Sequence, residues 1–146
     1  MGRLTFPILG DGLIVDVLVN LDAGLLLPRR ARGQDCDPAQ VKGIPDTGSN
    51  VTGVRPAVLA QLGIQPTSLG GTTTGVGGTV EVRLYRVSLH VYDASNVAMG
   101  MFTNPSVVAM ELPPHLDHDV LIGMDVLLGC VLTVDGPARR FTLDFP

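Results

Sequence analysis

The chain is predicted to adopt an all-β fold in a single domain, on the evidence of its length, its turn-forming residues and its short apolar runs. Its 146 residues suffice for one domain of ordinary size and not for two. The 18 glycines and 11 prolines indicate many turns between short elements. Runs of β-branched and other apolar residues lie between these turns, as in closed barrels and sandwiches. We therefore expect residues 1–146 to form one β-barrel or sandwich with one or two short helices.

The first forty residues predict two strands and a long loop. Residues 4–9 and 13–19 are apolar runs separated by Gly10-Asp11-Gly12, a pattern typical of a hairpin. The segment Asp22–Gln40 shows no consistent hydrophobic period and contains several prolines and arginines. We expect it to be a long loop that is either functional or mobile.

A short helix and a glycine-rich hairpin are predicted next. Residues 55–64 carry Pro56 at the first helical position and Gly63 at the expected left-handed stop. The glycine- and threonine-rich segment Gly70–Gly78 then leads into a long strand over residues 80–91. In that strand the apolar residues change parity, so we expect a β-bulge or a sharp bend near Tyr85 and Arg86. His90 lies on the polar side of the alternation and is expected to be exposed. The remaining predicted strands cover residues 97–102, 106–112, 120–123 and 141–145.

The charge and composition exclude several classes of function. Ten basic residues against 14 acidic ones give a net charge of -4, which is the wrong sign for nucleic-acid binding. Neither a membrane-spanning run nor a secretory signal is readable, so we expect no membrane partner and a cytoplasmic location. Cys36 and Cys130 have no metal-ligand spacing and are expected to be free thiols. Only 16% of residues are charged, which favours an oligomer.

The tetrad Asp46-Thr47-Gly48-Ser49 is the candidate catalytic motif. An aspartate at the head of a tight glycine turn places its carboxylate where backbone N–H groups and a nearby hydroxyl can orient it. Ser49 is positioned to supply that hydroxyl. Taken alone the tetrad is also compatible with an ordinary solvent-facing turn, so the rest of the chain decides its meaning.

Three blocks in the same order resemble the retropepsin-like aspartic proteases, that is, retroviral proteases and their cellular and bacterial relatives. The blocks are the Asp46 tetrad, the glycine hairpin Gly75-Val76-Gly77-Gly78 with its following strand, and the segment from Val120 to Leu127. The resemblance implies a peptide hydrolase that needs no metal or cofactor. The chemistry needs two carboxylates that share a proton, and the chain has one Asp-Thr-Gly, so the active unit is expected to be a homodimer.

The resemblance also implies roles for individual residues. Asp46 of each copy would activate the water, Thr47 would hydrogen-bond across the two-fold axis, and Gly48 would let backbone approach the carboxylates. Residues Gly75, Val76, Gly77 and Gly78 would form the flap over an extended peptide substrate. Leu121, Ile122 and Gly123 would brace the Asp46 loop, and Asp125 would be a structural residue and not a second catalytic acid.

Two departures from the family pattern lead to separate expectations. Pro45 precedes Asp46 where relatives usually have an aliphatic residue that donates to the strand ladder, so the active-site strand is expected to be distorted. Ser49 replaces a common alanine, and a hydroxyl donated to the Asp46 carboxylate would move the working range toward acid pH. Strands near residues 3–8 and 141–145 are expected to form a sheet between the two subunits.

Two alternatives remain open on the sequence. The chain could be a non-catalytic dimeric β-domain that binds extended peptides or serves in assembly, which the position of Pro45 favours. It could instead be a metal-dependent enzyme built on His115, His118 and their neighbouring aspartates, although no second cluster of ligands accompanies them.

Overall fold

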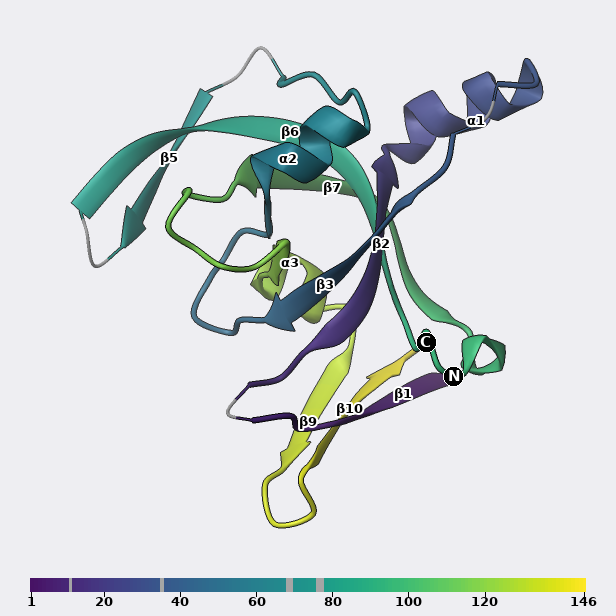
Figure 1. Cartoon of the computed structure of the whole chain (residues 1–146), viewed down its shortest axis with the longest axis vertical. Helices are drawn as coiled ribbons and strands as arrows, with labels where there is room; N and C mark the ends of the chain where they lie inside the picture. The colour runs from purple at the N-terminus through teal and green to yellow at the C-terminus, as the bar shows by residue number, and fades with distance from the viewer. Residues whose placement is uncertain (11, 35, 68–69, 76–77) are drawn as a thin grey trace.

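The computed structural model describes residues 1–10, 12–34, 36–67, 70–75 and 78–146 and confirms the all-β fold (Figure 1). The strands are β1 (Gly2–Pro7), β2 (Val15–Leu21), β3 (Ala39–Pro45), β4 (Gly53–Val54), β5 (Gly70–Gly75), β6 (Gly78–Tyr92), β7 (Met101–Glu111), β8 (Val120–Ile122), β9 (Val131–Asp135) and β10 (Arg140–Phe145). The helices are α1 (Ala23–Ala31), α2 (Pro56–Gln61) and α3 (Met124–Leu127), and η1 (Val97–Met99) is a 3-10 turn.

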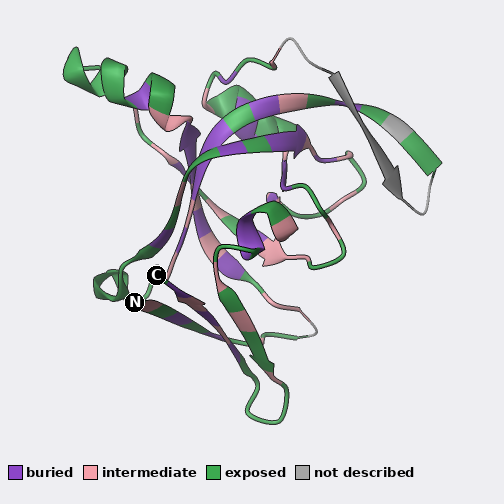
Figure 2. Cartoon of the chain, turned by 180° about the vertical axis from the view of Figure 1, so that it is seen from behind, coloured by how far each residue is buried: buried purple, intermediate pink, exposed green. Residues whose placement is uncertain are grey.

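A closed barrel forms the body of the molecule. Its strands follow the order β2, β3, β8, β4, β7 and β6, and a further antiparallel pairing between β2 and β6 closes it. Val15, Val17 and Val19 of β2 are almost completely buried inside the barrel (Figure 2). Because closure leaves β2 with neighbours on both sides, this strand has no free edge, and its nearly continuous apolar sequence is explained.

A three-stranded antiparallel sheet in the order β1, β10, β9 packs against the barrel. Phe6 and Phe141 stack with their ring centroids 5.3 Å apart, and Phe141 is fully buried. The two strands expected near residues 3–8 and 141–145 are therefore present, and they pair with each other within one chain. The expected hairpin around Gly10 and Gly12 is wrong, because β1 and β2 lie in different sheets and only an isolated bridge joins Leu9 to Gly12; Asp11 lies outside the described residues.

The predicted loop Asp22–Gln40 is also wrong, because it contains helix α1 and the start of β3. Asp22 caps the helix by accepting a hydrogen bond from the backbone N–H of Gly24, at 2.9 Å. Leu26 is its buried residue, while Leu25 and Leu27 on either side are exposed. Pro28 lies inside the helix, where proline is disfavoured. With one buried residue and an internal proline, the segment carries no helical period that the sequence could reveal.

The change of parity in β6 has a different cause from the predicted bulge. The register from Leu84 to Val87 against β7 is continuous, so no bulge lies at Tyr85 and Arg86. Val82 packs on one face of the strand in a small cluster with Met110 and Leu112, and Tyr85 points from the other face into the main core. The strand is thus buried first on one face and then on the other. The irregularity lies between Val87 and Leu89, opposite two residues of β7.

The other predicted elements divide into confirmed and corrected ones. Helix α2 begins at Pro56 and ends with Gly63 at a φ of +66°, where the N–H of Ile64 donates to the carbonyl of Leu59 at 3.0 Å, as predicted. β8 and β10 also fall where expected. The strand predicted over residues 97–102 is instead η1 followed by the start of β7, and β4 and β9 were not predicted.

His90 is half-buried and not exposed as expected. Its Nδ1 accepts a hydrogen bond from the backbone N–H of Asn104, at 3.3 Å, which requires that nitrogen to be unprotonated. Burial and, to a smaller extent, the positive charge of Arg30 on α1 lower the pKa of His90 below its usual value.

The lowered pKa of His90 makes stability depend on pH in a definite direction. Because the unfolded chain takes up this proton first, the stabilisation is present above the unfolded pKa of about 6.5 and is lost as the pH falls through the folded pKa. We expect the free energy of unfolding in urea to drop between about pH 7.5 and pH 5.5, and the drop to be smaller in His90→Gln. His115→Gln, at an exposed position, should keep the wild-type drop, and equal pH dependence in wild type and His90→Gln would contradict the assignment.

Candidate functional site

The Asp46 turn begins where β3 leaves the barrel. β3 pairs in parallel with β8, and the backbone N–H of Asp46 donates to the carbonyl of Ile122 at 2.8 Å. The last hydrogen bond of this ladder therefore sets the position of the aspartate. Ile122 is buried and Leu121 half-buried, so the strand that braces the turn is anchored in the core as expected.

Pro45 fits the strand without the expected distortion. Since N–H groups alternate sides along a strand and that of Asp46 points to β8, the nitrogen of Pro45 points to the β2 side. The pairing of β2 with β3 ends at Val15 and Gly43, so no partner carbonyl waits there for a donor. Proline lies at the one kind of strand position that tolerates it. Pro45 therefore does not distort the strand that carries Asp46.

Within the turn, one carboxylate oxygen of Asp46 is held by backbone. The N–H of Gly48 donates to Asp46 Oδ1 at 2.8 Å, and the N–H of Ser49 donates to the Asp46 carbonyl at 3.2 Å. A Cβ atom at Gly48 would lie 3.2 Å from the same carboxylate oxygen, which is tighter than ordinary contact. Asp46 is half-buried, while Thr47 and Gly48 are exposed. A second molecule could reach these exposed residues directly.

Ser49 does not orient the carboxylate as expected. Its hydroxyl donates to the carbonyl of Val51 at 2.7 Å, and a hydroxyl has one proton to donate. The Ser49 hydroxyl therefore makes no hydrogen bond to the Asp46 carboxylate. The predicted shift toward an acid working range depended on that bond. Ser49 instead stiffens the backbone that follows the turn.

Gly123 lies very close to the backbone of residues 49–51, and this contact fixes the Asp46 turn against α3. A Cβ atom at Gly123 would lie 2.7 Å from the carbonyl carbon of Val51 and 3.0 Å from the oxygen of Ser49. The N–H of Met124 donates to the same Ser49 oxygen at 2.8 Å. Only glycine leaves room for this contact, because the opposing atoms are backbone and cannot swing aside.

Hydrogen bonds between Thr52 and Asp125 hold the same two segments together. The Thr52 hydroxyl donates to Asp125 Oδ1 at 2.7 Å and accepts from the N–H of Gly123 at 3.1 Å, and the Thr52 N–H donates to Asp125 Oδ2 at 3.1 Å. Asp125 Oδ1 also accepts from the N–H of Val126. Asp125 thus accepts the hydrogen bonds that join Thr52 to the start of α3. Thr52, which is fully buried, was missed, because a single threonine between Val51 and Gly53 gives no sequence signal.

The expected flap is a hairpin of β5 and β6 that extends beyond the barrel (Figure 1). Gly75 pairs with Gly78, which has a φ of +99°. That backbone conformation suits glycine at a tight hairpin turn. Val76 and Gly77, the other two predicted flap residues, lie outside the described residues.

The rival metal site receives no support from the described part of the chain. His115 and His118 are both exposed, and no group of three or more metal-ligating side chains comes together among the described residues. Cys36 and Cys130 are free, as expected, and burial followed by the charge of Asp144 raises the pKa of the Cys130 thiol. None of the described helices is long and apolar enough to cross a membrane.

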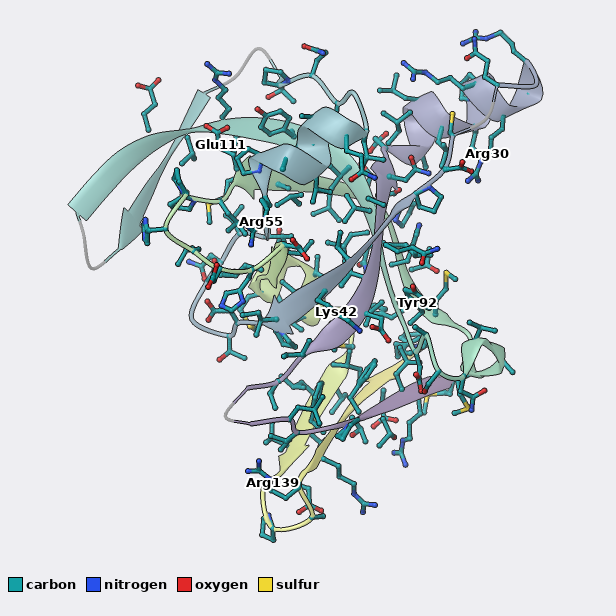
Figure 3. All side chains as sticks on the ribbon, viewed as in Figure 1. Arg30, Lys42, Arg55, Tyr92, Glu111 and Arg139 are labelled. Carbon is teal, nitrogen blue, oxygen red and sulfur yellow. The ribbon has the colours of Figure 1, made fainter. Side chains whose placement is uncertain are left out.

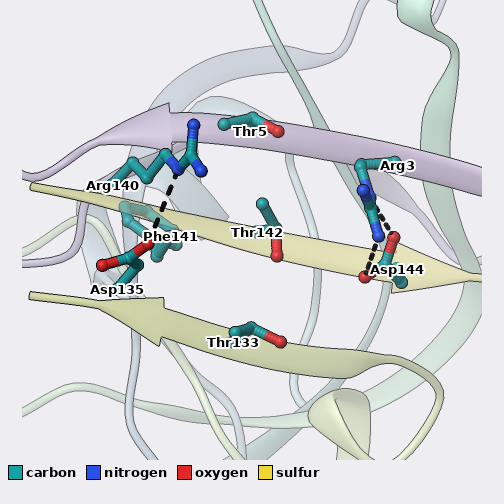
Figure 4. A pocket seen from close by; sticks show the side chains of 8 residues that line it. All are labelled: Arg3, Thr5, Thr133, Asp135, Arg140, Phe141, Thr142 and Asp144. Carbon is teal, nitrogen blue, oxygen red and sulfur yellow. Dashed lines mark hydrogen bonds and ion pairs between the residues drawn. The ribbon is translucent and has the colours of Figure 1, made fainter. Parts of the chain in front are cut away.

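Figure 3 shows the side chains of the described residues, with Lys42 of β3 and Arg55 among those labelled. Arg55 forms an ion pair with Asp119 at 3.2 Å, at the start of β8. A groove of about 320 Å³ lies elsewhere, on the outer face of the sheet β1, β10, β9 (Figure 4). No residue of the Asp46 tetrad lines that groove.

Comparison with known proteins agrees with this geometry. A family model described as aspartyl protease matches residues 33–126, which is more than half of the chain, so the chain belongs to the aspartyl protease family. Among solved structures, a retropepsin-like aspartic protease from Rickettsia conorii has a TM-score of 0.63 and 14% sequence identity over 99% of this chain and 91% of that chain. The two share the retropepsin-like fold. No curated protein sequence matches the chain.

The hydrogen bonds of the buried Thr52 predict that removing its hydroxyl lowers the stability of the fold. In Thr52→Val the buried N–H of Gly123 loses its acceptor, and Asp125 Oδ1 keeps only the N–H of Val126 as a donor, so the free energy of unfolding should fall by about 1–3 kcal/mol. Thr103→Val, at an exposed position of β7, should stay within about 0.5 kcal/mol of wild type. Urea denaturation of both variants measures the free energy of unfolding. Equal stability of the two would show that the Thr52 hydrogen bonds do not stabilise the fold.

Proposed function

We propose that the chain is an endopeptidase that hydrolyses peptide bonds with two Asp46 carboxylates, one from each subunit of a homodimer. The observation that carries the proposal is the Asp46 turn, a half-buried carboxylate held by backbone at the end of a barrel strand. The chain contains one Asp-Thr-Gly sequence, so a second copy is needed to supply the other acid. Family membership supports the reaction class.

The pair would work by sharing one proton. Two carboxylates about 3 Å apart cannot both ionise, so one is charged and the other protonated. The charged Asp46 removes a proton from water as the water oxygen attacks the peptide carbonyl carbon, and the protonated Asp46 gives its proton to the carbonyl oxygen. The tetrahedral intermediate then breaks its C–N bond, and the leaving amine takes the proton first removed from water. As the C=O bond re-forms, a hydroxyl of the intermediate returns its proton to the other Asp46, so the pair again holds one proton. No metal takes part in these steps.

The substrate would be an extended segment of peptide or protein. The hairpin of β5 and β6 would cover it and pair with its backbone, and pockets on either side would accept alternate side chains. Glycines at the ends of the hairpin turn keep its backbone accessible, which agrees with this role. Thr47, exposed beside Asp46, would hydrogen-bond across the two-fold axis.

The direct test replaces Asp46 with a side chain of the same size that carries no charge. We expect Asp46→Asn to lower the cleavage rate of an unstructured protein by roughly 10²–10⁴-fold or more, with the fold unchanged. Asp37→Asn, at an exposed site outside the turn, is the matched control and should cleave like wild type. Chelator should leave the rate unchanged, and a statine-type transition-state mimic should inhibit it.

The outcome separates the proposal from its rival. Equal inertness of wild type and Asp46→Asn from acid to neutral pH, with retained peptide binding, would support the non-catalytic binding domain. Loss of wild-type cleavage on adding chelator would support the metal-dependent alternative.

A further inference from the structure

Strand β9 is an edge strand that lacks the usual protection. In the sheet β1, β10, β9 it pairs with β10 on one side, and no other described strand pairs with its second side. Its sequence Val131-Leu-Thr-Val-Asp135 contains no lysine or proline, the residues that most often prevent edge strands from pairing with other chains. Val131 and Val134 are 62% and 54% exposed, and Leu128 just before the strand is 78% exposed. A row of unpaired backbone groups flanked by exposed apolar side chains favours pairing with another strand.

The strand is complementary to a second copy of itself. If two β9 strands pair antiparallel about an axis through Thr133, Thr133 faces its own counterpart and Leu132 faces Val134. These are favourable cross-strand pairs, and Val134 would gain an apolar neighbour. Thr5, Thr142 and Thr133 already form a row across β1, β10 and β9, and this register continues the row into the second subunit (Figure 4).

The charges on the sheet permit the same arrangement. Asp135 is the one charged residue of β9, and in this register it faces Val131 of the other copy. The two Asp135 side chains would lie about 13 Å apart along the strands, beyond the screening length at physiological salt. Arg3 donates to both carboxylate oxygens of Asp144, at 2.5 and 3.1 Å, so this inner pair is satisfied within each chain and places no unpaired charge at the axis.

The chain also connects β9 closely to the Asp46 turn. The backbone N–H of Asp46 donates to Ile122 of β8, and β9 follows β8 after the short helix α3. A strand of five residues alone is too short for a stable dimer. It could contribute one part of an interface to which the Asp46 turn contributes the other.

We propose that β9 is the dimerisation strand: two copies pair antiparallel at Thr133 and join their three-stranded sheets into one. This inference rests on the proposed homodimer and names its interface. It names β9 in place of the strands near residues 3–8 and 141–145, because β10 already has partners on both sides and the edge strand β1 carries Arg3 and ends in Pro7.

A cysteine placed on the axis tests the register. Opposite residues of an antiparallel pair have Cα atoms about 4.5–5.5 Å apart, within the range of a disulfide. In a background of Cys36→Ser and Cys130→Ser, we expect Thr133→Cys to form a covalent dimer on mild oxidation. Val131→Cys, also exposed, should remain uncrosslinked because its counterpart would lie about 13 Å away. Crosslinking of neither variant, or of Val131→Cys alone, would overturn the proposal.

A charge at the edge tests the association itself. Val134→Lys places a cation beside the axis at an exposed position, so the variant should fold and sediment as a monomer at concentrations where wild type is a dimer. Val97→Lys, on the exposed η1 turn, should remain dimeric. If Thr133→Cys crosslinks but wild type cleaves nothing, the interface stands and the proposed activity fails. If wild type cleaves while Val134→Lys stays dimeric, the activity stands and the interface fails.

Discussion

The site depends on a contact between two pieces of backbone, in which Gly123 lies against residues 49–51. Because a Cβ atom at position 123 would come within 2.8 Å of the Val51 carbonyl oxygen, the two segments can approach only as glycine permits. The buried Thr52 and the exposed Asp125 hold the segments together once they meet. The polypeptide after Asp46 is thus fixed from the side of α3, and the ladder of β3 and β8 fixes it from the other side. Preorganisation of this kind is what a carboxylate needs if it is to meet a partner acid at a set distance.

The barrel separates the rigid part of the molecule from its additions. β2, most of whose residues are buried, pairs on both sides and closes the structure. Helix α1 is inserted between β2 and β3, and β5 extends beyond the closed set of strands, so neither interrupts the ladder that positions Asp46. Pro45 is accommodated for the same reason, since it lies past the end of β2. Features that look disruptive in the sequence fall at places where the barrel makes no demand on them.

Local chemistry explains what the sequence could predict. The Asp46 tetrad, helix α2 with its glycine stop, and the apolar strand before Gly123 each carry their signal within a few residues. What failed depends on distant partners. The bulge lies in β7 and not at Tyr85 and Arg86. The apolar residues of β6 change parity because the strand is buried first on one face and then on the other. Ser49 bonds Val51 and not Asp46, and Thr52 gains its role only when Asp125 reaches it. α1 buries one leucine, too few to produce a helical period.

The central claim is that one chain holds half of an active site, and mixing two kinds of subunit tests it directly. Wild type and Asp46→Asn are combined in equal amounts and allowed to exchange subunits. The cleavage rate is then measured at a fixed total protein concentration. If both carboxylates are required, random pairing leaves about a quarter of the pairs with two aspartates, and the cleavage rate should fall to about a quarter of the rate of wild type alone at the same total protein concentration. A rate that stays at about half after complete exchange would mean that each Asp46 acts without its counterpart, and would contradict the shared site.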